Sequence, residues 1–364
     1  MTNKRYHSIK PGGSILNSDE PVAVEYRKEL MEYLKDYPSG PGKSDLKRRL
    51  RSYTESGFYS ACFELFLHHI LVGRCQKVNP HPDLPNITTH PEFGVAHSAG
   101  DFYLEATLAL ESEEYQAQEQ RLLDLVDTLR DIKGNVILWA QPVTHLPADF
   151  PLDSVRDFLN REIGRLCPAD LQLPKTLTFQ ANFNKCPVII DFEIMGADQE
   201  NCDSVVQAWG APEAREVTTH YRIRRRIRCK AGKYGNMMAP YVIAVWPRTK
   251  LTREVALRAL YGDEQIRISP ESHEVIGRTR AQNGAFNTMV SGNLLNHEVS
   301  AVALYREEFS LASYERRLYI YHNPYTSNPL PEEIFLDSPQ FVFRTSESGD
   351  GRMEWLSGVD PWDE

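Results

Sequence analysis

The chain has 364 residues, of which 41% are hydrophobic and 25% are charged, so its composition excludes collagen-like, coiled-coil and fully disordered proteins. Its 41 basic and 50 acidic residues give a net charge of −9, which argues against a dedicated nucleic-acid coat protein. Six widely spaced cysteines exclude a disulfide scaffold, and no apolar run reaches the ~20 residues that span a bilayer.

The spacing of apolar residues predicts an alternation of helices and strands. In chain order these are helices 22–37 and 46–72, strands 74–79, 93–96 and 102–108, helix 112–132, strand 136–140, helix 153–166, strands 177–183 and 186–194, helix 217–237, strand 241–246, helix 253–261, and strands 299–305 and 318–322. Gly57 is a candidate break in the second helix, and 262–296 is predicted to consist mainly of loops. Strand 102–108, the helix after it and strand 136–140 have the order of a parallel strand–helix–strand unit.

We predict one large α/β domain with insertions rather than two clean domains. The expected segments are a flexible arm (1–20), a helical segment (21–54), an α/β core (55–250), a C-terminal extension packed on the core (251–345) and a solvated acidic tail (346–364). The first residues contain no apolar signal segment, so we expect a cytoplasmic protein that does not interact with membranes.

Three carboxylates occur in an order that suggests a metal site. Glu64 lies on an amphipathic helix, Glu92 precedes the first strand of the 93–108 hairpin, and Glu105 lies in the second strand. A hairpin can bring Glu92 alongside Glu105, and two adjacent carboxylates are unfavourable unless a cation lies between them. Mg²⁺ is the natural cation, because one or two carboxylates with waters and phosphate oxygens hold it. Each glutamate alone would be read as a solvated residue.

A basic segment follows later in the chain. Seven cations and no acid lie between residues 222 and 233: Arg222, Arg224, Arg225, Arg226, Arg228, Lys230 and Lys233. The segment is either the solvated face of a helix or a surface for an anionic partner, and repulsion among like charges favours the partner.

The motif order resembles the PD-(D/E)xK, or restriction-endonuclease-like, nuclease superfamily, and in particular a branch with a helical Glu, a PDF-type hairpin and an xEAT strand. The matching residues span about 55–247: Glu64, His81-Pro82, Leu84-Pro85, Pro91-Glu92-Phe93, Leu104-Glu105-Ala106-Thr107, Lys230–Gly235 and Pro240–Val245. The resemblance implies a restriction-endonuclease-like core with a central mixed β-sheet flanked by helices, and a C-terminal extension that contains strands.

Two departures from the family pattern bear on activity. Glu92 stands where the family usually has Asp, and Thr107 stands where it has the Lys of (D/E)xK. Threonine cannot supply the positive charge of that lysine, so we expect Lys230 or Lys233 to replace it. In the mechanism that the resemblance implies, Glu92 and Glu105 hold Mg²⁺ or Mn²⁺ and Glu64 orients the metal. The arginines between 222 and 228 then bind the nucleic-acid backbone without reading sequence.

These observations predict a metal-dependent nuclease, a hydrolase that cleaves phosphodiesters. We expect DNA rather than RNA as its nucleic-acid partner. The sequence leaves open whether the protein is a homodimer, which would supply the two active sites that paired cuts need. The alternative is a catalytically inactive protein of the same fold that binds nucleic acid or a protein partner, which Glu92 and Thr107 both favour. A third hypothesis is an interaction protein without a nucleic-acid role, which the net charge of −9 favours.

Overall fold

A computed structural model shows two compact units. The main unit contains the described residues of 10–110 and 217–364, and the inserted unit contains those of 111–216. The structure describes residues 19–362 apart from 53, 86, 111–120, 122–123, 126–127, 130–131, 133–135, 143–145, 148, 167–174, 185, 198–206, 211–218, 236, 250, 270–273, 291–292, 310–312 and 346–350. Within these ranges no helix has both the length and the apolar character needed to cross a bilayer.

Three helices begin the described part of the main unit: α2 (Pro21–Asp36), α3 (Pro41–Leu50) and α4 (Glu55–Arg74). Proline occupies the first turn of α2 and α3, where its missing N–H costs no hydrogen bond. The side chain of Thr54 caps α4 by accepting a hydrogen bond from the Gly57 amide (3.2 Å). The predicted break in helix 46–72 therefore exists, but it lies before α4, and Gly57 belongs to the first turn of that helix.

The main unit is built on an eight-stranded mixed sheet with the order β1-β2-β3-β8-β13-β14-β15-β16. Its strands are β1 (Lys77–Pro80), β2 (Phe93–Ala96), β3 (Phe102–Leu108), β8 (Tyr241–Trp246), β13 (Ala301–Phe309), β14 (Tyr314–His322), β15 (Gln340–Thr345) and β16 (Gly351–Trp355). β8 pairs in parallel with both β3 and β13, and β1, β2 and β3 pair antiparallel. The predicted α/β class with a mixed sheet flanked by helices is confirmed.

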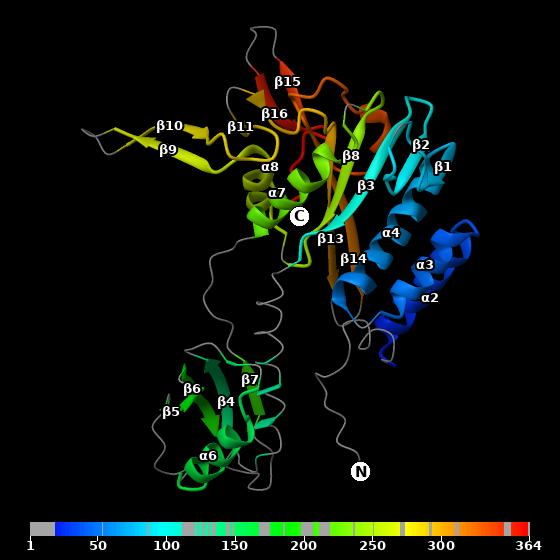
Figure 1. Cartoon of the computed structure of the whole chain (residues 1–364). Coiled ribbons are helices and arrows are strands. Elements are labelled where there is room, and N and C mark those ends of the chain that lie inside the picture. Colours follow the sequence, from blue (N-terminus) through cyan, green and yellow to red (C-terminus); the bar gives the residue numbers. More distant parts are fainter. Residues whose placement is uncertain are drawn as a thin grey trace. The chain divides into compact units, whose positions relative to one another are not determined.

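Helices cover both faces of this sheet (Figure 1). Val242, Ala244 and Trp246 of β8 belong to the core that α2, α3 and α4 share with the sheet. Tyr241, Ile243 and Val245 point the other way, into the core formed with α7 (Thr219–Ala231) and α8 (Arg253–Tyr261). This alternation follows from the two-residue period of a strand buried on both faces.

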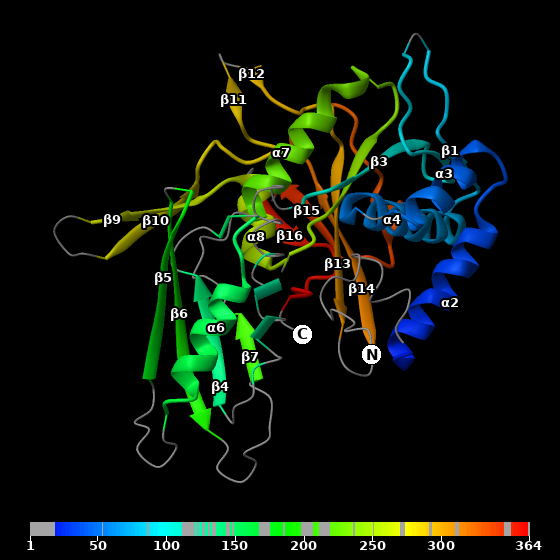
Figure 2. The ribbon, with the colours of Figure 1, turned by 60° about the horizontal axis from the view of Figure 1, so that its bottom comes forward.

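Two small hairpins of the main unit follow α8, within the stretch that the sequence predicts to consist mainly of loops. They pair β9 (Glu264–Ile268) with β10 (Val275–Arg280), and β11 (Met289–Val290) with β12 (Asn293–Leu294). Figure 2 shows both extending away from the large sheet. Sequence patterning missed β9 and β10 because nearly all of their side chains are exposed, so burial imposes no alternation of apolar and polar residues.

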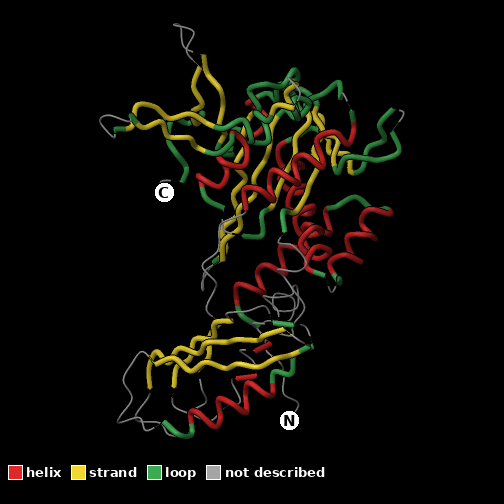
Figure 3. Tube along the Cα trace, turned by 60° about the vertical axis from the view of Figure 1, so that its left-hand side comes forward, coloured by secondary structure: helices red, strands yellow, loops and turns green. Residues whose placement is uncertain are grey.

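The inserted unit has its own four-stranded sheet in the order β5-β6-β4-β7. Its strands are β4 (Val136–Pro142), β5 (Lys175–Phe183), β6 (Cys186–Ala197) and β7 (Gln207–Gly210). Helix α6 (Asp153–Ile163) runs along one face of this sheet and buries Val155, Leu159 and Ile163 (Figure 3). β5 and β6 form the predicted hairpin, which turns at Asn184 with a φ of 48°.

The structure differs from the sequence-based expectations at two further places. β4 lies in the sheet of the inserted unit, so the predicted strand–helix–strand unit from β3 to 136–140 is wrong, and the parallel neighbour of β3 is β8. The predicted solvated tail contains β16, and Trp362 stacks on Tyr319 with ring centroids 4.2 Å apart. The predicted helix 112–132 and the arm 1–20 lie mostly outside the described residues.

Candidate active site

The hairpin of β2 and β3 places two glutamates opposite each other. Phe93 pairs with Leu104 in this antiparallel register, so the next pair outward is Glu92 with Glu105. The two carboxyl groups are hydrogen-bonded, and Glu92 Oε2 also accepts a hydrogen bond from the Ala106 amide (3.2 Å). Glu105 is fully buried, and its register with Ile243 directs it toward the face that α7 covers.

The end of α7 brings three donors to Glu105. Lys230 donates to Oε1, and the Lys233 ammonium lies 3.0 Å from the same oxygen. The Tyr234 hydroxyl lies 2.5 Å from Oε2 of Glu105 and 2.6 Å from the carbonyl oxygen of His90. A short 3₁₀ turn (Gly232–Tyr234) follows α7 directly and makes this convergence possible, because it carries Lys233 and Tyr234 to the side of Lys230.

The pKa values of the two carboxyl groups are shifted in opposite directions. Burial, together with the hydrogen bond to Glu105 and its charge, raises the pKa of Glu92 to about 9. Burial alone would also raise the pKa of Glu105, but the hydrogen bond from Glu92 and the charge of Lys230 hold that pKa below its usual value. At neutral pH Glu92 therefore carries a proton and Glu105 is ionised. One negative charge faces two ammonium groups, so the site as a whole attracts anions.

Thr107 follows Glu105 by two residues and lies half-buried on the same strand face. Glu105 receives its cations from α7 instead of this position, from residues 125 and 128 positions later in the chain. The structure thus brings together the predicted Glu92, Glu105, Lys230 and Lys233.

Glu64, which lies on α4, has a separate set of partners from other elements. It is 3% exposed, and Arg49 of α3 forms an ion pair with its Oε2. The Tyr37 hydroxyl donates to its Oε1 (2.8 Å), and His81 Nε2 lies 3.5 Å from the same oxygen. Burial opposes ionisation, but the hydrogen bond from His81 and the charge of Arg49 lower the pKa of Glu64, so it is a carboxylate at neutral pH.

Tyr37 belongs to the Glu64 cluster through its hydrogen bond to Oε1. Burial raises the pKa of Tyr37 first, and the charge of Glu64 raises it further. The structure pairs Glu64 with a guanidinium group, whereas the sequence-based hypothesis assigned Glu64 to orienting a metal.

The arginines of α7 divide between the interior and the surface. Arg224 is 4% exposed and donates to the Arg258 carbonyl and to Asp263 Oδ1 (3.0 Å), so it holds α7 against α8. Arg222 is half-buried, whereas Arg225, Arg226 and Arg228 are exposed. The surface that could meet a nucleic-acid backbone is thus narrower than the sequence indicates.

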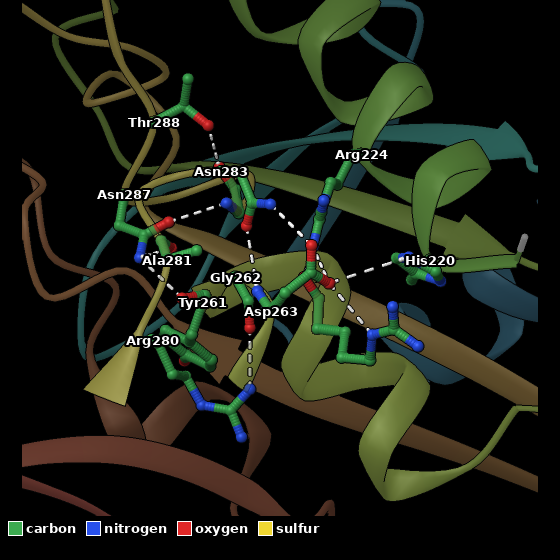
Figure 4. Close-up of polar contacts among 12 residues, drawn as sticks. His220, Arg224, Tyr261, Gly262, Asp263, Arg280, Ala281, Asn283, Asn287 and Thr288 are labelled. Atoms are coloured by element: carbon green, nitrogen blue, oxygen red, sulfur yellow. Dashed lines mark hydrogen bonds and ion pairs between the residues drawn. The ribbon is translucent and has the colours of Figure 1, made fainter. Parts of the chain in front are cut away.

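A polar network around Asp263 holds the ends of α7 and α8 and the 281–288 loop together (Figure 4). The carboxylate of Asp263 accepts hydrogen bonds from Arg224, Arg258 and the Asn283 side chain, and these donors lower its pKa to about 2 against the effect of burial. Asn287 closes the loop by donating to the carbonyl oxygens of Tyr261 (2.6 Å) and Ala281 (3.0 Å).

Sequence reasoning gave no role to Tyr234, Tyr37 or Arg49. Tyr234 adjoins Lys233 in the Lys230–Gly235 motif, and this adjacency was the available signal for it. Tyr37 and Arg49 carry no such signal, because they reach Glu64 only through the packing of α2 and α3 on α4.

The described residues contain no cluster of three or more His, Cys, Asp or Glu side chains suited to a metal ion. Mg²⁺ does not require one, since one or two carboxylates with waters and phosphate oxygens suffice. Glu92 and Glu105 are the two facing carboxyl groups that could hold such an ion, and Oε1 of Glu105 already contacts Lys230 and Lys233.

Comparison of the chain with protein-family models, with curated proteins and with solved structures gave no match.

Proposed function

We propose that the protein is a metal-dependent nuclease that hydrolyses phosphodiester bonds at the Glu92–Glu105 pair. The observation that carries the proposal is the convergence of a buried carboxyl group (Glu105) and a half-buried one facing it (Glu92) with two lysines on one carboxylate oxygen. Paired carboxylates with an adjacent cation are a combination that phosphoryl-transfer sites use for positioning and charge stabilisation.

Glu92 and Glu105 would hold Mg²⁺ or Mn²⁺. The bound metal would polarise the scissile phosphate and lower the pKa of a coordinated water. Lys230 and Lys233 would stabilise the negative charge that develops on the phosphate oxygens, the role for which Thr107 is unsuited. Tyr234 would keep Glu105 in place through its hydrogen bond to Oε2.

Nucleic acid would be held through its phosphates. Arg225 and Arg226 are exposed on α7 and form no ion pair with a described residue, so their charges are available to an anion. Among the described residues Arg228 donates to neutral groups, Thr288 Oγ1 (2.8 Å) and the Asn283 carbonyl (3.5 Å). Contacts of this kind bind without reading sequence.

The test is cleavage of single- and double-stranded DNA and RNA with Mg²⁺ or Mn²⁺, and with EDTA as the metal-free control. We expect cutting by the wild type and a loss on the order of 100-fold or more in Glu105→Gln, because metal ions and fixed charges supply several kcal/mol to such reactions. Glu315→Gln, which changes an exposed strand glutamate of β14, is the matched control and should cut normally. Circular dichroism of each variant establishes that it folds. Equal cutting by both variants would refute the proposal.

One observation favours a second candidate, a protein of this fold that binds nucleic acid without cutting it. Both lysines already contact Glu105 Oε1, so their ammonium groups neutralise the carboxylate that a metal would otherwise need. Salt-sensitive binding by the wild type without cleavage in any metal would support this candidate.

A further inference from the structure

A cavity of about 450 Å³ lies beside α7. It is lined by Tyr221, Arg224, Arg225, Arg228, Cys229 and Asn283. Five of these residues recur at the i, i+3, i+4, i+7 and i+8 positions of α7, so they share one face of the helix. The volume falls within the range of about 300–1,000 Å³ that is usual for small-molecule sites.

One of the three arginines that line this cavity is paired with a carboxylate, and the other two are not paired with a described carboxylate. Arg224 is paired with Asp263, and Figure 4 shows that Asp263 is also bound by Asn283. Arg225 has no ion pair or hydrogen bond with a described residue, and Arg228 is bonded only to neutral oxygens. Two positive charges without a carboxylate partner among the described residues therefore line the cavity, and Asp263, which pairs with Arg224, is already bound by other donors.

Tyr221 adds an aromatic surface at the same place. Its side chain is 47% exposed, the Arg224 guanidinium lies 5.3 Å from its ring centroid, and the His220 ring centroid lies 4.0 Å from it. The exposed part of an aromatic ring that is held by an arginine and a histidine is suited to stack on a nucleobase, and stacking requires a base whose own face is free.

We propose that this cavity binds a nucleoside monophosphate group, with the phosphate on Arg225 and Arg228 and the base on Tyr221. A terminal phosphate monoester carries nearly two negative charges, whereas an internal diester carries one, so the monoester matches the two positive charges of Arg225 and Arg228. The group is either the phosphorylated end of an unpaired strand or a free nucleotide. The choice of a nucleotide as the ligand rests on the proposed nuclease function.

The test measures binding in EDTA, so that no cleavage occurs and the pocket is examined independently of the carboxylates. A short oligothymidylate labelled at its 3′ end is compared with and without a 5′-phosphate by fluorescence anisotropy. We expect the phosphorylated strand to bind about tenfold more tightly, which corresponds to one hydrogen-bonded charge contact. Arg225→Ala and Arg228→Ala should abolish this preference. Arg226→Ala, which removes one charge from α7 outside the cavity lining, should keep the preference even if overall affinity falls.

Cys229 provides a local readout, because it is an exposed free thiol in the cavity wall. Slower alkylation of Cys229 by N-ethylmaleimide in AMP would support the free-nucleotide form, and protection by the phosphorylated strand alone would support the strand-end form. Equal protection by inorganic phosphate would overturn the role of Tyr221. Equal loss of the preference in all three arginine variants would overturn the pocket. Failure of the nuclease proposal would instead appear as absent cleavage in metal with the 5′-phosphate preference intact.

Discussion

Replacing Glu92 with glutamine should make the protein's stability less dependent on pH. In metal-free buffer at neutral pH the Glu92 carboxyl keeps its proton, because burial and the neighbouring Glu105 raise its pKa to about 9. Glutamine has nearly the same shape and resembles this protonated form. Glu92→Gln therefore removes the titration while it retains a neutral side chain that can still donate a hydrogen bond to Glu105.

The sign and size follow from proton linkage. The pKa of Glu92 is raised on folding, so its contribution to stability is complete below the ordinary glutamate pKa and is lost as pH rises toward 9. Between these limits the unfolded chain has released the proton and the folded chain holds it, which lowers the free energy of unfolding by about 1.4 kcal/mol per pH unit. From pH 6 to pH 8 the wild type should lose about 2 to 3 kcal/mol relative to Glu92→Gln.

Urea denaturation of both proteins at several pH values in EDTA measures this difference. Histidines also titrate in this range, but the same histidines are present in both proteins, so their contributions cancel in the comparison. Parallel stability–pH curves for wild type and Glu92→Gln would refute the shared proton. A divergence that appears only below pH 5 would show that folding lowers the pKa of Glu92 instead of raising it.

Three further outcomes are expected. Lys230→Ala or Lys233→Ala should lower metal-dependent cleavage by about tenfold or more, since oxyanion donors are typically worth that much or more, and unchanged rates in both would contradict the lysine role. Arg49→Met should lower the free energy of unfolding by about 3–5 kcal/mol in urea titrations, because it leaves the carboxylate of Glu64 buried without a cation. Asp263→Asn should cost about 2 kcal/mol or more by the same measurement, since a buried arginine of α7 loses its partner, and a loss below about 0.5 kcal/mol would show that the pair contributes little.

Sequence patterning located the elements whose burial is one-sided or complete. β2, β3, β8 and α8 occupy the predicted residues, because their apolar side chains repeat with the strand or helix period. The facing of Glu92 and Glu105 was also predictable, since it depends only on the register of one short hairpin.

Long-range assembly was not predictable from the sequence. Nothing local distinguishes β4 from a strand of the large sheet, because an apolar strand reads the same in either sheet. Arg224 and Arg226 have the same side chain two positions apart, yet one is buried against Asp263 and the other is exposed. Only the packing of α8 and the 281–288 loop against α7 separates them.

The inserted unit has a consequence for how the paired carboxylates are completed during synthesis. Lys230 follows Glu105 by 125 residues, and the inserted unit accounts for most of that interval. At about 5–20 residues per second, a ribosome would deliver the lysine about 6–25 s after the glutamate. During that time the β2–β3 hairpin exists without its cations or its parallel neighbour β8, whereas the inserted unit already has its complete strand set. We therefore expect the inserted unit to fold on the nascent chain before the main unit does.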